Sequence, residues 1–547
     1  MNSSFTTIDY IIFGLYALVI LSVGLWVSRG KKGVKKTAQD YFLANKSLPW
    51  WAVGASLIAA NISAEQMIGM SGSGMAIGLS IATYEWMAAL TLIIVGKYFL
   101  PIFIEKGLYT IPEFIEKRFS TNLKTILAVF WIALFIFVNL TSVLFLGGKA
   151  IDTILGQGDG SMIFPAIVAL ALFAAAYSLY GGLAAVAWTD VIQVTLLVIG
   201  GMITTVIALD HVTPDGGIFN GISHVYETAG DKFHMILKRG NPEFMNLPGI
   251  GVLIGGMWIA NLYYWGFNQY IIQRTLAAKS LKEAQKGIVF AAFLKLIIPL
   301  FVVVPGIIAY VMFTDPQGTA VIDGVQDAFL KSDGSMNYDK AYPWLISTFI
   351  PSGLKGLVVA ALAAAIVSSL ASMVNSTSTI FTMDIYKPYL AKKNGKNRDV
   401  MVGRIAAGSA LLIAIFVAPA LGNIEQAFQY IQEYTGVVSP GILAVFMMGL
   451  FYKKANNKGA IVGVMSSIPV ALALKTPSLE LPWMDQMLYT FLITMVVIVF
   501  VSLSTNKLHD DPKAINVTSD TFKTGKAFNV AAYAICIILV VLYTVFW

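Results

Sequence analysis

Two apolar stretches of the sequence carry polar side chains that could bind a solute or an ion. The stretch from Pro49 to Gly74 contains Asn61, Ser63, Glu65 and Gln66 near its middle. Carboxyl and amide groups lose strong hydrogen bonds to water inside a bilayer, so they persist there where they face a protein interior, a water-filled cavity or a solute. The pattern predicts a discontinuous transmembrane helix. A continuous helix whose polar side chains bond to neighbouring helices would also explain it.

A second stretch of the same kind follows in the other half of the chain. In residues 248–272, two adjacent glycines precede Asn261, and Asn268 and Gln269 follow it. Paired interrupted helices at corresponding positions of two halves are the sequence pattern of a transporter binding site.

Opposite charges lie in two further apolar stretches. Glu85 stands between aromatic residues, and Lys295 is surrounded by leucine, isoleucine and phenylalanine. The two could neutralise one another or share a polar ligand, and we expect the ligand. Asp190, one turn into another apolar stretch, could cap backbone amides or serve an ion.

A group of small residues indicates where a cation could bind. Ala365, Ser368 and Ser369 are spaced i, i+3, i+4, which places them on one face of a helix. Serine hydroxyls in membrane helices commonly bond back to the carbonyl a turn earlier, which would make them structural. Sodium, however, takes oxygen ligands, and the carbonyls of Ala59 and Ile62 would be free where the helix 49–73 unwinds. We therefore expect a sodium site here.

The composition determines which class of protein must position these residues. The chain has 547 residues, of which 57% are hydrophobic and 12% charged, and a mean hydropathy of +0.74. This is an all-α polytopic membrane protein, and apolar runs of about 17 to 25 residues predict fourteen transmembrane helices. The predicted helices cover residues 8–28, 49–73, 77–104, 123–155, 161–180, 184–208, 248–272, 287–313, 342–385, 400–420, 423–451, 458–474, 484–504 and 527–547.

The placement of basic residues predicts the topology. Lys and Arg collect in alternate loops, which the positive-inside rule places in the cytoplasm, so both termini are expected outside. This placement also accounts for the net charge of +7 without a nucleic-acid partner. The basic loops run from Arg29 to Lys46, Lys106 to Lys124, Arg274 to Lys286, Lys387 to Arg404, Lys453 to Lys458 and Lys507 to Lys526.

Motifs for other kinds of chemistry are missing from the sequence. The single cysteine, Cys536, excludes an internal disulfide framework and a cysteine-based metal cluster. The glycine-rich run from Ser71 to Gly78 follows no strand and so does not indicate a nucleotide site. We expect no enzyme activity and no cofactor. A passive channel would need a continuous polar lining, and a sensor would need an appended output domain, which no loop here is long enough to hold.

Long runs of the chain resemble the sodium:solute symporter family, most closely its bacterial sodium/galactose (glucose) cotransporters. These runs are PWWAVGASLIAANISAEQ, YEWM, GGLAAVAWTDVIQ, NLYYWGFNQYIIQRTLAAKS, ALAAAIVSSLASM, AFQYIQEYTGVVSPGILAVF and GLFYKKANNKGAIVG, and the resemblance covers essentially the whole chain. It implies a LeuT-like core of two inverted five-helix repeats in the inner membrane of a bacterium. The expected units are residues 1–48, the first repeat 49–208, an extracellular loop 209–247, the second repeat 248–451 and three C-terminal helices in 452–547.

The resemblance also implies roles for individual residues in symport of a hexose, galactose or glucose, with sodium as co-substrate. The implied sugar site consists of Asn61, Gln66, Glu85, Asn261, Lys295, Gln432 and Tyr264. Implied gates are Tyr264 with Trp265 on the inner side, and Met70, Tyr84 and Phe428 on the outer side. The implied sodium ligands are the Ala59 and Ile62 carbonyls with Ala365, Ser368 and Ser369, and Asp190 lies on the sodium route. Ala88 stands where the nearest relatives carry a serine, which removes one possible sugar contact.

The residue chemistry agrees with a sugar. Hexose hydroxyls both donate and accept, which suits amides beside a carboxylate and an ammonium, and the CH face of the ring stacks on an aromatic side chain. Proline, the main alternative in the family, would instead place its carboxylate at a bare helix N-terminus. Sialic acid and myo-inositol are further alternatives. The expected partners are sugar, sodium and lipid, and nothing in the sequence specifies an oligomeric state.

Overall fold

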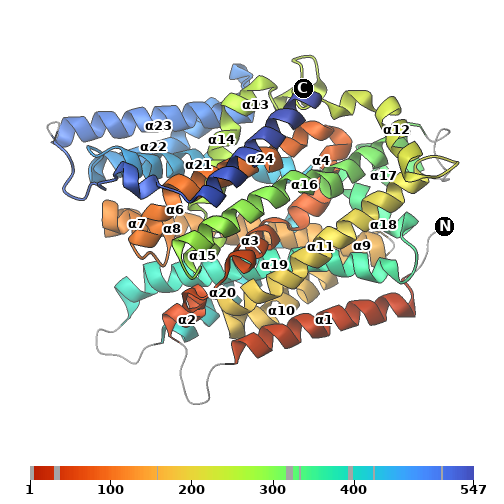
Figure 1. Cartoon of the computed structure of the whole chain (residues 1–547), viewed down its shortest axis with the longest axis horizontal. Helices are drawn as coiled ribbons and strands as arrows, with labels where there is room; N and C mark the ends of the chain where they lie inside the picture. Colours follow the sequence, from red (N-terminus) through yellow and green to blue (C-terminus); the bar gives the residue numbers. More distant parts are fainter. Residues whose placement is uncertain are drawn as a thin grey trace.

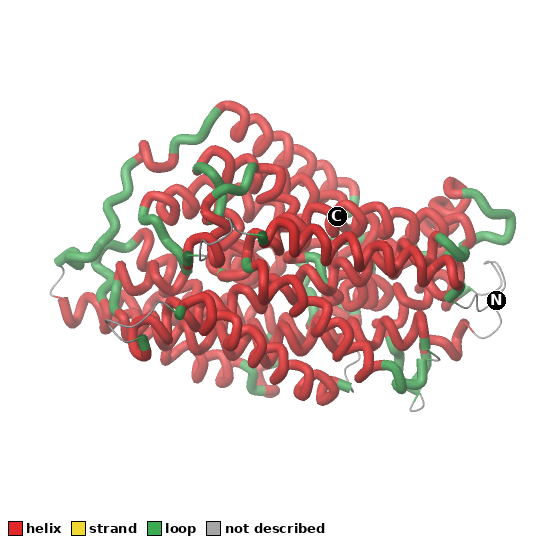
Figure 2. Tube along the Cα trace, turned by 90° about the horizontal axis from the view of Figure 1, so that it is seen from below, coloured by secondary structure: helices red, strands yellow, loops and turns green. Residues whose placement is uncertain are grey.

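The long helices of the protein run side by side along one direction and form a single bundle (Figure 1). The computed structural model describes residues 5–29, 37–156, 158–315, 325–331, 334–391, 398–422, 426–506 and 509–547. Within these ranges, β-type pairing is limited to two isolated bridges, Leu48 with Ala278 and Leu330 with Met336. Figure 2 shows the same helical packing from below, with loops gathered mainly at the two ends of the helices. Parts of three basic loops, residues 30–36, 392–397 and 507–508, lie outside the described ranges.

The first half of the chain alternates long helices with short ones. Its α-helices are α1 (Thr7–Ser28), α2 (Ala38–Leu43), α3 (Trp50–Asn61), α4 (Ser71–Ala76), α5 (Thr83–Ile94), α6 (Leu100–Glu105), α7 (Ile111–Arg118), α8 (Thr121–Leu134), α9 (Thr141–Leu155), α10 (Ile163–Gly181), α11 (Leu183–His211) and α12 (Ile218–Thr228). Wider π-helical turns continue three of the spans, at η2 (Glu65–Met70), η4 (Val95–Phe99) and η5 (Phe135–Leu140).

The second half repeats this alternation. Its α-helices are α13 (Ile250–Ile254), α14 (Gly256–Leu262), α15 (Gln269–Leu276), α16 (Leu281–Thr314), α17 (Val325–Phe329), α18 (Ala341–Phe349), α19 (Leu354–Ile380), α20 (Asp399–Val417), α21 (Ala427–Phe451), α22 (Asn457–Leu474), α23 (Trp483–Asn506) and α24 (Lys526–Val545). The π-helical turns are η8 (Tyr263–Phe267) and η10 (Phe381–Leu390). The short 3-10 turns of both halves are η1 (Ala44–Lys46), η3 (Leu79–Ala82), η6 (Gly230–Phe233), η7 (Pro242–Met245), η9 (Tyr338–Lys340), η11 (Ala418–Leu421), η12 (Pro477–Leu479) and η13 (Ser519–Phe522).

The predicted count of fourteen membrane-spanning helices is wrong in detail. The described residues contain twelve helices long and apolar enough to cross a membrane, or thirteen if one bent pair counts as a single span. The missing span is the predicted helix 49–73, which the structure divides into α3, η2 and α4, each too short to cross alone. The predicted helix 342–385 is also divided, because α18 ends at Phe349 and α19 starts at Leu354. Hydropathy records apolarity but not whether the helical hydrogen bonds continue.

The helix break in the first stretch falls at Ile62 and Ser63. Ile62 has an extended backbone, with φ −75° and ψ 107°, and helical hydrogen bonding resumes only from Ala64 onward. The side chain of Gln66 accepts from the backbone N–H and the hydroxyl of Ser63, both at 3.0 Å. A polar side chain thus replaces the lost backbone acceptor, which lets the chain turn without an unpaired donor in the membrane. The prediction of a discontinuous helix is consistent with this geometry.

Helix α16 holds both parts of the broken helix in place through three close glycine contacts. A Cβ on Gly54 would lie 2.6 Å from the carbonyl oxygen of Gly287, and a Cβ on Gly74 would lie 2.6 Å from that of Val303. A Cβ on Gly306 would likewise lie 1.9 Å from the carbonyl oxygen of Ser71. Small residues allow membrane helices to approach this closely. Because α16 also carries Lys295, these contacts fix Lys295 relative to the break.

The second interrupted stretch bends more sharply. The pair Pro242–Ile254 and Gly256–Phe267 meets at 78° at Gly255. A second interruption follows at Asn268, whose ψ of 122° separates η8 from α15. The predicted interruptions therefore coincide with real ones, although the stretch is a bent pair plus a short helix rather than one helix over 248–272.

Arg274 contradicts the predicted loop from Arg274 to Lys286. It belongs to α15 and is fully buried, and Lys286 belongs to α16. Arg118 and Lys124, at the end of the second basic loop, are also buried, with side chains 1% and 3% exposed. A count of charges along the sequence does not distinguish a buried, paired cation from a solvated one.

Candidate functional site

A cavity lies at the break between α3 and η2, and residues from seven parts of the chain line it. All eleven residues predicted for the sugar site and the gates belong to its lining, as does Ala88. The lining residues that the sequence prediction did not include are Glu65, Leu134, Asn139, Ala260, Tyr263, Asn268, Thr435, Gly436, Ser439, Trp483 and Met487. The structure therefore brings the predicted residues together, while their roles remain predictions.

A buried ion pair forms the polar centre of this cavity. Lys295 donates through Nζ to Oε2 of Glu85 and to Oδ1 of Asn61 in two very short contacts. The Nζ atom also lies 4.9 Å from the centroid of the Trp265 ring, a cation–π distance. Three segments distant in the sequence thus meet at one ammonium group. Exposure of the Lys295 and Glu85 side chains is 1% and 3%.

Several polar atoms in the described lining of this cavity have no protein partner. Among the described residues, the Nδ2 of Asn261, the hydroxyl of Tyr84, the Oδ1 of Asn268 and the hydroxyl of Ser439 are buried without a hydrogen-bond partner. All four residues line the cavity. Buried donors and acceptors normally find partners, so such a group of unpaired atoms indicates a place for a polar ligand. Donors and acceptors are both present, as a polyhydroxylated ligand requires.

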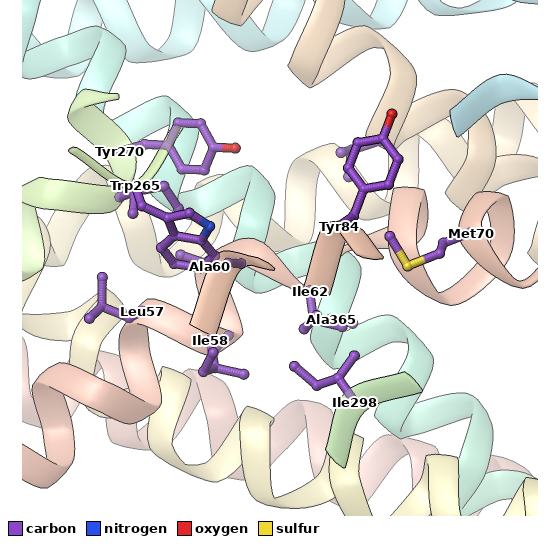
Figure 3. Close-up of a cluster of buried hydrophobic side chains, with 14 of the residues drawn as sticks. Leu57, Ile58, Ala60, Ile62, Met70, Tyr84, Trp265, Tyr270, Ile298 and Ala365 are labelled. Atoms are coloured by element: carbon purple, nitrogen blue, oxygen red, sulfur yellow. The ribbon is translucent and has the colours of Figure 1, made fainter. Parts of the chain in front are cut away.

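Aromatic side chains lie on two sides of the helix break. In Figure 3, Tyr84 and Met70 lie on one side of Ala60 and Ile62, and Trp265 lies on the other. Tyr84 packs edge-to-face on Phe428 with ring centroids 5.0 Å apart.

A chain of hydrogen bonds ties the Trp265 side to the break. Tyr264 packs edge-to-face on Trp265, with centroids 5.2 Å apart. Its hydroxyl accepts from Nδ2 of Asn61 at 3.0 Å and from the hydroxyl of Tyr270 at 2.7 Å. Tyr264 is therefore held directly against the residue that closes α3.

The predicted sodium ligands lie where α19 packs against the end of α3. The Ser369 hydroxyl contacts the carbonyl oxygens of Ala60 at 3.0 Å and of Ala59 and Ile62 at 3.5 Å each. Ala365 lies one turn earlier on α19 and appears below Ile62 in Figure 3. Carbonyls that the helix break frees thus lie against a hydroxyl, an all-oxygen environment that suits a hard cation.

Ser368 has a different environment from Ser369. Its hydroxyl donates to Oδ1 of Asp190 at 2.6 Å, so its lone pairs remain available to an ion. The other oxygen of Asp190 accepts from the Ser56 hydroxyl and lies 3.9 Å from Nη2 of Arg274. Arg274 in turn donates to Ser56, to the Tyr270 carbonyl and to Ser372. Asp190 is therefore not an N-terminal cap but part of a buried polar cluster.

The sequence signals for the missed residues differ. Glu65 and Asn268 are polar residues in the interrupted stretches. The sequence therefore indicated that they lie near the helix breaks, but not that they line the cavity. In the structure Glu65 accepts from the Ser142 hydroxyl at 2.6 Å. Trp483 and Met487 belong to α23, outside the expected repeats, and carry no sequence signal. Gln269, by contrast, was noted in the sequence but does not line the cavity. Its side chain accepts from the backbone N–H of Ile111 at 2.8 Å.

A loop covers the end of the broken helix that follows η2. Lys232 donates through Nζ to the carbonyl oxygen of Ala76, the last residue of α4, at 2.5 Å and lies 4.4 Å above the Tyr310 ring. Burial lowers the pKa of the Lys232 ammonium, and the nearby Glu243 carboxylate partly offsets this. The loop is tied in turn to the chain end, because Met235 donates through its backbone N–H to the carbonyl of Phe546 at 2.7 Å.

The chain is similar to known sodium-coupled symporters. The model of the sodium:solute symporter family matches residues 41–467. A sodium/glucose cotransporter of Vibrio parahaemolyticus is 66% identical over 99% of this chain and 98% of its own length. The human sodium/myo-inositol cotransporter 2 is 35% identical over 85% of this chain and 69% of its own length. The rat sodium/glucose cotransporter 2 is 32% identical over 86% of this chain and 71% of its own length.

Solved structures share the fold. A substrate-bound, outward-open Na⁺-coupled sialic acid symporter superposes with a TM-score of 0.77 over 91% of this chain and 98% of its own, at 24% identity. A nucleobase-cation-symport-1 family transporter gives 0.53 over 91% of this chain and 99% of its own, at 12% identity. The predicted LeuT-like helical architecture is confirmed at the level of the fold.

Proposed function

Because the chain belongs to the sodium:solute symporter family, we propose that it couples inward sodium flow to uptake of a hexose, galactose or glucose, by alternating access. The observation that carries the proposal is the cavity at the helix break. There a Lys295–Glu85 pair, unpaired amide and hydroxyl groups and the Trp265 ring surround one space. The relative named as a sodium/glucose cotransporter, at 66% identity, supports the same substrate class.

The charge balance of the cavity favours a neutral substrate. Lys295 already contacts Glu85, so an anionic substrate such as sialic acid would have to compete with a built-in carboxylate. A sugar can instead accept from the ammonium and donate to the carboxylate without displacing either, and charge-assisted hydrogen bonds of this kind are the stronger ones. The aromatic ring of Trp265 offers a stacking surface for the CH face of a sugar.

The helix break provides a physical link between the two ligands. The α3 segment ends in carbonyls that lie against Ser369, and the next side chain to face the cavity is Asn61, which contacts Lys295. A cation bound to those carbonyls would stabilise the broken form of the helix, and that form presents Asn61 and Gln66 to the sugar. Coupling then follows because each ligand favours the same backbone conformation.

The second candidate substrate is myo-inositol, a ring polyol with a similar set of hydroxyls. A human relative named as a sodium/myo-inositol cotransporter supports it, at 35% identity. Uptake of labelled galactose, glucose, myo-inositol, proline and sialic acid into proteoliposomes, with and without a sodium gradient, distinguishes the candidates. Sodium-dependent uptake of proline or sialic acid but not of a hexose would contradict the proposal.

The proposed coupling has an energetic consequence. One sodium ion moving through about 100 mV contributes about 2.3 kcal/mol, and a tenfold sodium gradient about 1.4 kcal/mol. Together they would support roughly 500-fold accumulation of a neutral sugar at one-to-one stoichiometry. In sealed proteoliposomes, accumulation should therefore occur at zero potential and rise when the interior is made negative. Equilibration without accumulation would indicate a uniporter.

A further inference from the structure

A groove on the membrane-facing surface lies between α16 and α24, away from the central cavity. Figure 1 shows α24 beside α16, and the two helices are in contact. The lining consists of Trp50, Lys286, Val289, Phe290, Phe293, Ala527, Phe528, Ala531, Ala534, Ile535 and Ile538. All but Lys286 are apolar, so the groove can accept a hydrocarbon chain along its length.

Small residues on α24 keep the groove open. Ala527, Ala531 and Ala534 are spaced i, i+4, i+7 and so lie on one face of that helix. Phe528 and Ile535 form the base, with 7% and 3% exposure. The mouth of the groove is wide open, since Phe293 and Ile538 are 48% and 38% exposed. The space is therefore a surface slot facing lipid rather than an internal void.

The dimensions of the groove correspond to one leaflet of a bilayer. The α24 part of its lining runs from Ala527 to Ile538, a rise of about 16 Å at 1.5 Å per residue. Half of the hydrocarbon core is about 15 Å thick. A single acyl chain could thus follow the groove from the membrane surface to the bilayer centre.

Charged and interfacial residues mark one end of the groove. Lys286 lies in the lining with its side chain 45% exposed, and Lys526 begins α24 at the same end. The nearby acid, Glu283, lies 3.4 Å from Lys286 but also accepts from the backbone N–H of Trp50 at 2.9 Å, so it is shared with the start of α3. Trp50 is 38% exposed, and tryptophan is typical of the membrane interface.

We propose that this groove binds an anionic phospholipid, with the phosphate at Lys286 and one acyl chain between α16 and α24. The positive-inside pattern assigns the Lys286 end to the cytoplasmic leaflet, whose anionic lipids attract basic residues next to the membrane. The acyl chain lies against Phe293, two positions before Lys295 on α16. The lipid thus supports the outer face of the helix that brings the ammonium group into the central cavity.

Photolabelling of the full-length protein tests the site. The protein is placed in phosphatidylcholine nanodiscs with a small fraction of phosphatidylglycerol that carries a photoreactive acyl chain, and the labelled peptides are mapped by mass spectrometry. Labels should concentrate on the groove residues of α16 and α24 and be weak on exposed apolar residues of α22, such as Val462 and Leu472. Uniform labelling of all lipid-facing helices would overturn the proposal.

Two pairs of variants separate the acyl chain from the headgroup. Ala534→Trp fills the groove and should remove most of the labelling, while Leu472→Trp on α22 should leave it unchanged; Ala534→Leu serves if the larger residue prevents folding. Lys286→Gln should lower the preference for phosphatidylglycerol over phosphatidylcholine about fivefold, the effect of one lysine near an anionic surface. Lys458→Gln, an exposed lysine on α22, should not change it. Labelling that survives Ala534→Trp, or a preference unaffected by Lys286→Gln, would overturn the proposal.

Discussion

Two buried cations, Lys295 and Arg274, lie in the same bundle but in different kinds of surroundings. Lys295 contacts Glu85 and Asn61 at the edge of a cavity, and unpaired polar atoms lie nearby. Arg274 donates to two serine hydroxyls and a backbone carbonyl. The cluster around Lys295 leaves donors and acceptors available to a ligand. The cluster around Arg274 uses its hydrogen bonds to connect α15, α3 and α19. Burial of a charge therefore does not by itself indicate a binding site. Unpaired polar atoms next to the charge are the feature that indicates one.

The largest effect is expected at the structural cluster. Arg274→Met removes the cation that faces the buried Asp190 carboxylate, and breaking such a pair costs about 3 to 5 kcal/mol of folding free energy. The thermal midpoint of the purified protein should fall strongly. Arg274→Lys, which keeps the charge, should lose less. A stable Arg274→Met protein that has lost only sugar binding would show that the Arg274 cluster serves the ligand rather than the fold.

The next largest effect is expected at the cavity, on affinity. Losing a hydrogen bond to a charged group costs roughly 1.5 to 3 kcal/mol, so Glu85→Ala or Lys295→Ala should weaken hexose binding by about one to two decades. The double variant Glu85→Gln/Lys295→Met leaves no unpaired charge and should fold well while still binding sugar poorly. Isothermal titration measures the affinity. Unchanged affinity in both single variants would make this pair structural as well.

A smaller effect is expected where the two clusters approach one another, at the serines of α19. Ser369→Ala removes a hydroxyl next to the freed carbonyls, and Ser368→Ala removes the link to Asp190. Each should raise the sodium concentration for half-maximal uptake about fivefold, as expected for the loss of about 1 kcal/mol. Ser466→Ala on α22, whose hydroxyl donates to the Gly463 carbonyl of its own helix, is the control. If the double variant kept its sodium dependence, Ser368 and Ser369 would not be sodium ligands.

The smallest effect is expected from adding a group to the cavity. Ala88→Ser places a hydroxyl in the lining without removing any contact, because Ala88 already faces the cavity. One neutral hydrogen bond contributes about 0.5 to 1.5 kcal/mol, so the ratio of galactose to glucose affinity should change severalfold. Competition between the two sugars for binding measures the ratio. An unchanged ratio would mean that the added hydroxyl does not reach the bound sugar.

Local chemistry in the sequence was enough to determine the class of this protein and the segments that matter. Apolar runs indicate a membrane protein, and polar residues inside them are costly enough to mark a site without any knowledge of the fold. The interruptions near Asn61 and Gly255 were visible for the same reason. The family resemblance then named side chains that do line one cavity.

Tertiary structure decided which polar residues meet and which of them remain unpaired. Ser368 and Ser369 are adjacent, and the sequence does not distinguish their roles. The packing of α11 and α3 against α19 brings the Ser368 hydroxyl to Asp190 and the Ser369 hydroxyl to the freed carbonyls. Arg274 looked like a loop cation, and only its contacts across the bundle place it in the core. Hydrogen bonds between residues far apart in the chain produce no periodic pattern in the sequence. The spacing of residues in a helix shows which of them share a face, but not which atoms of other helices pack against that face.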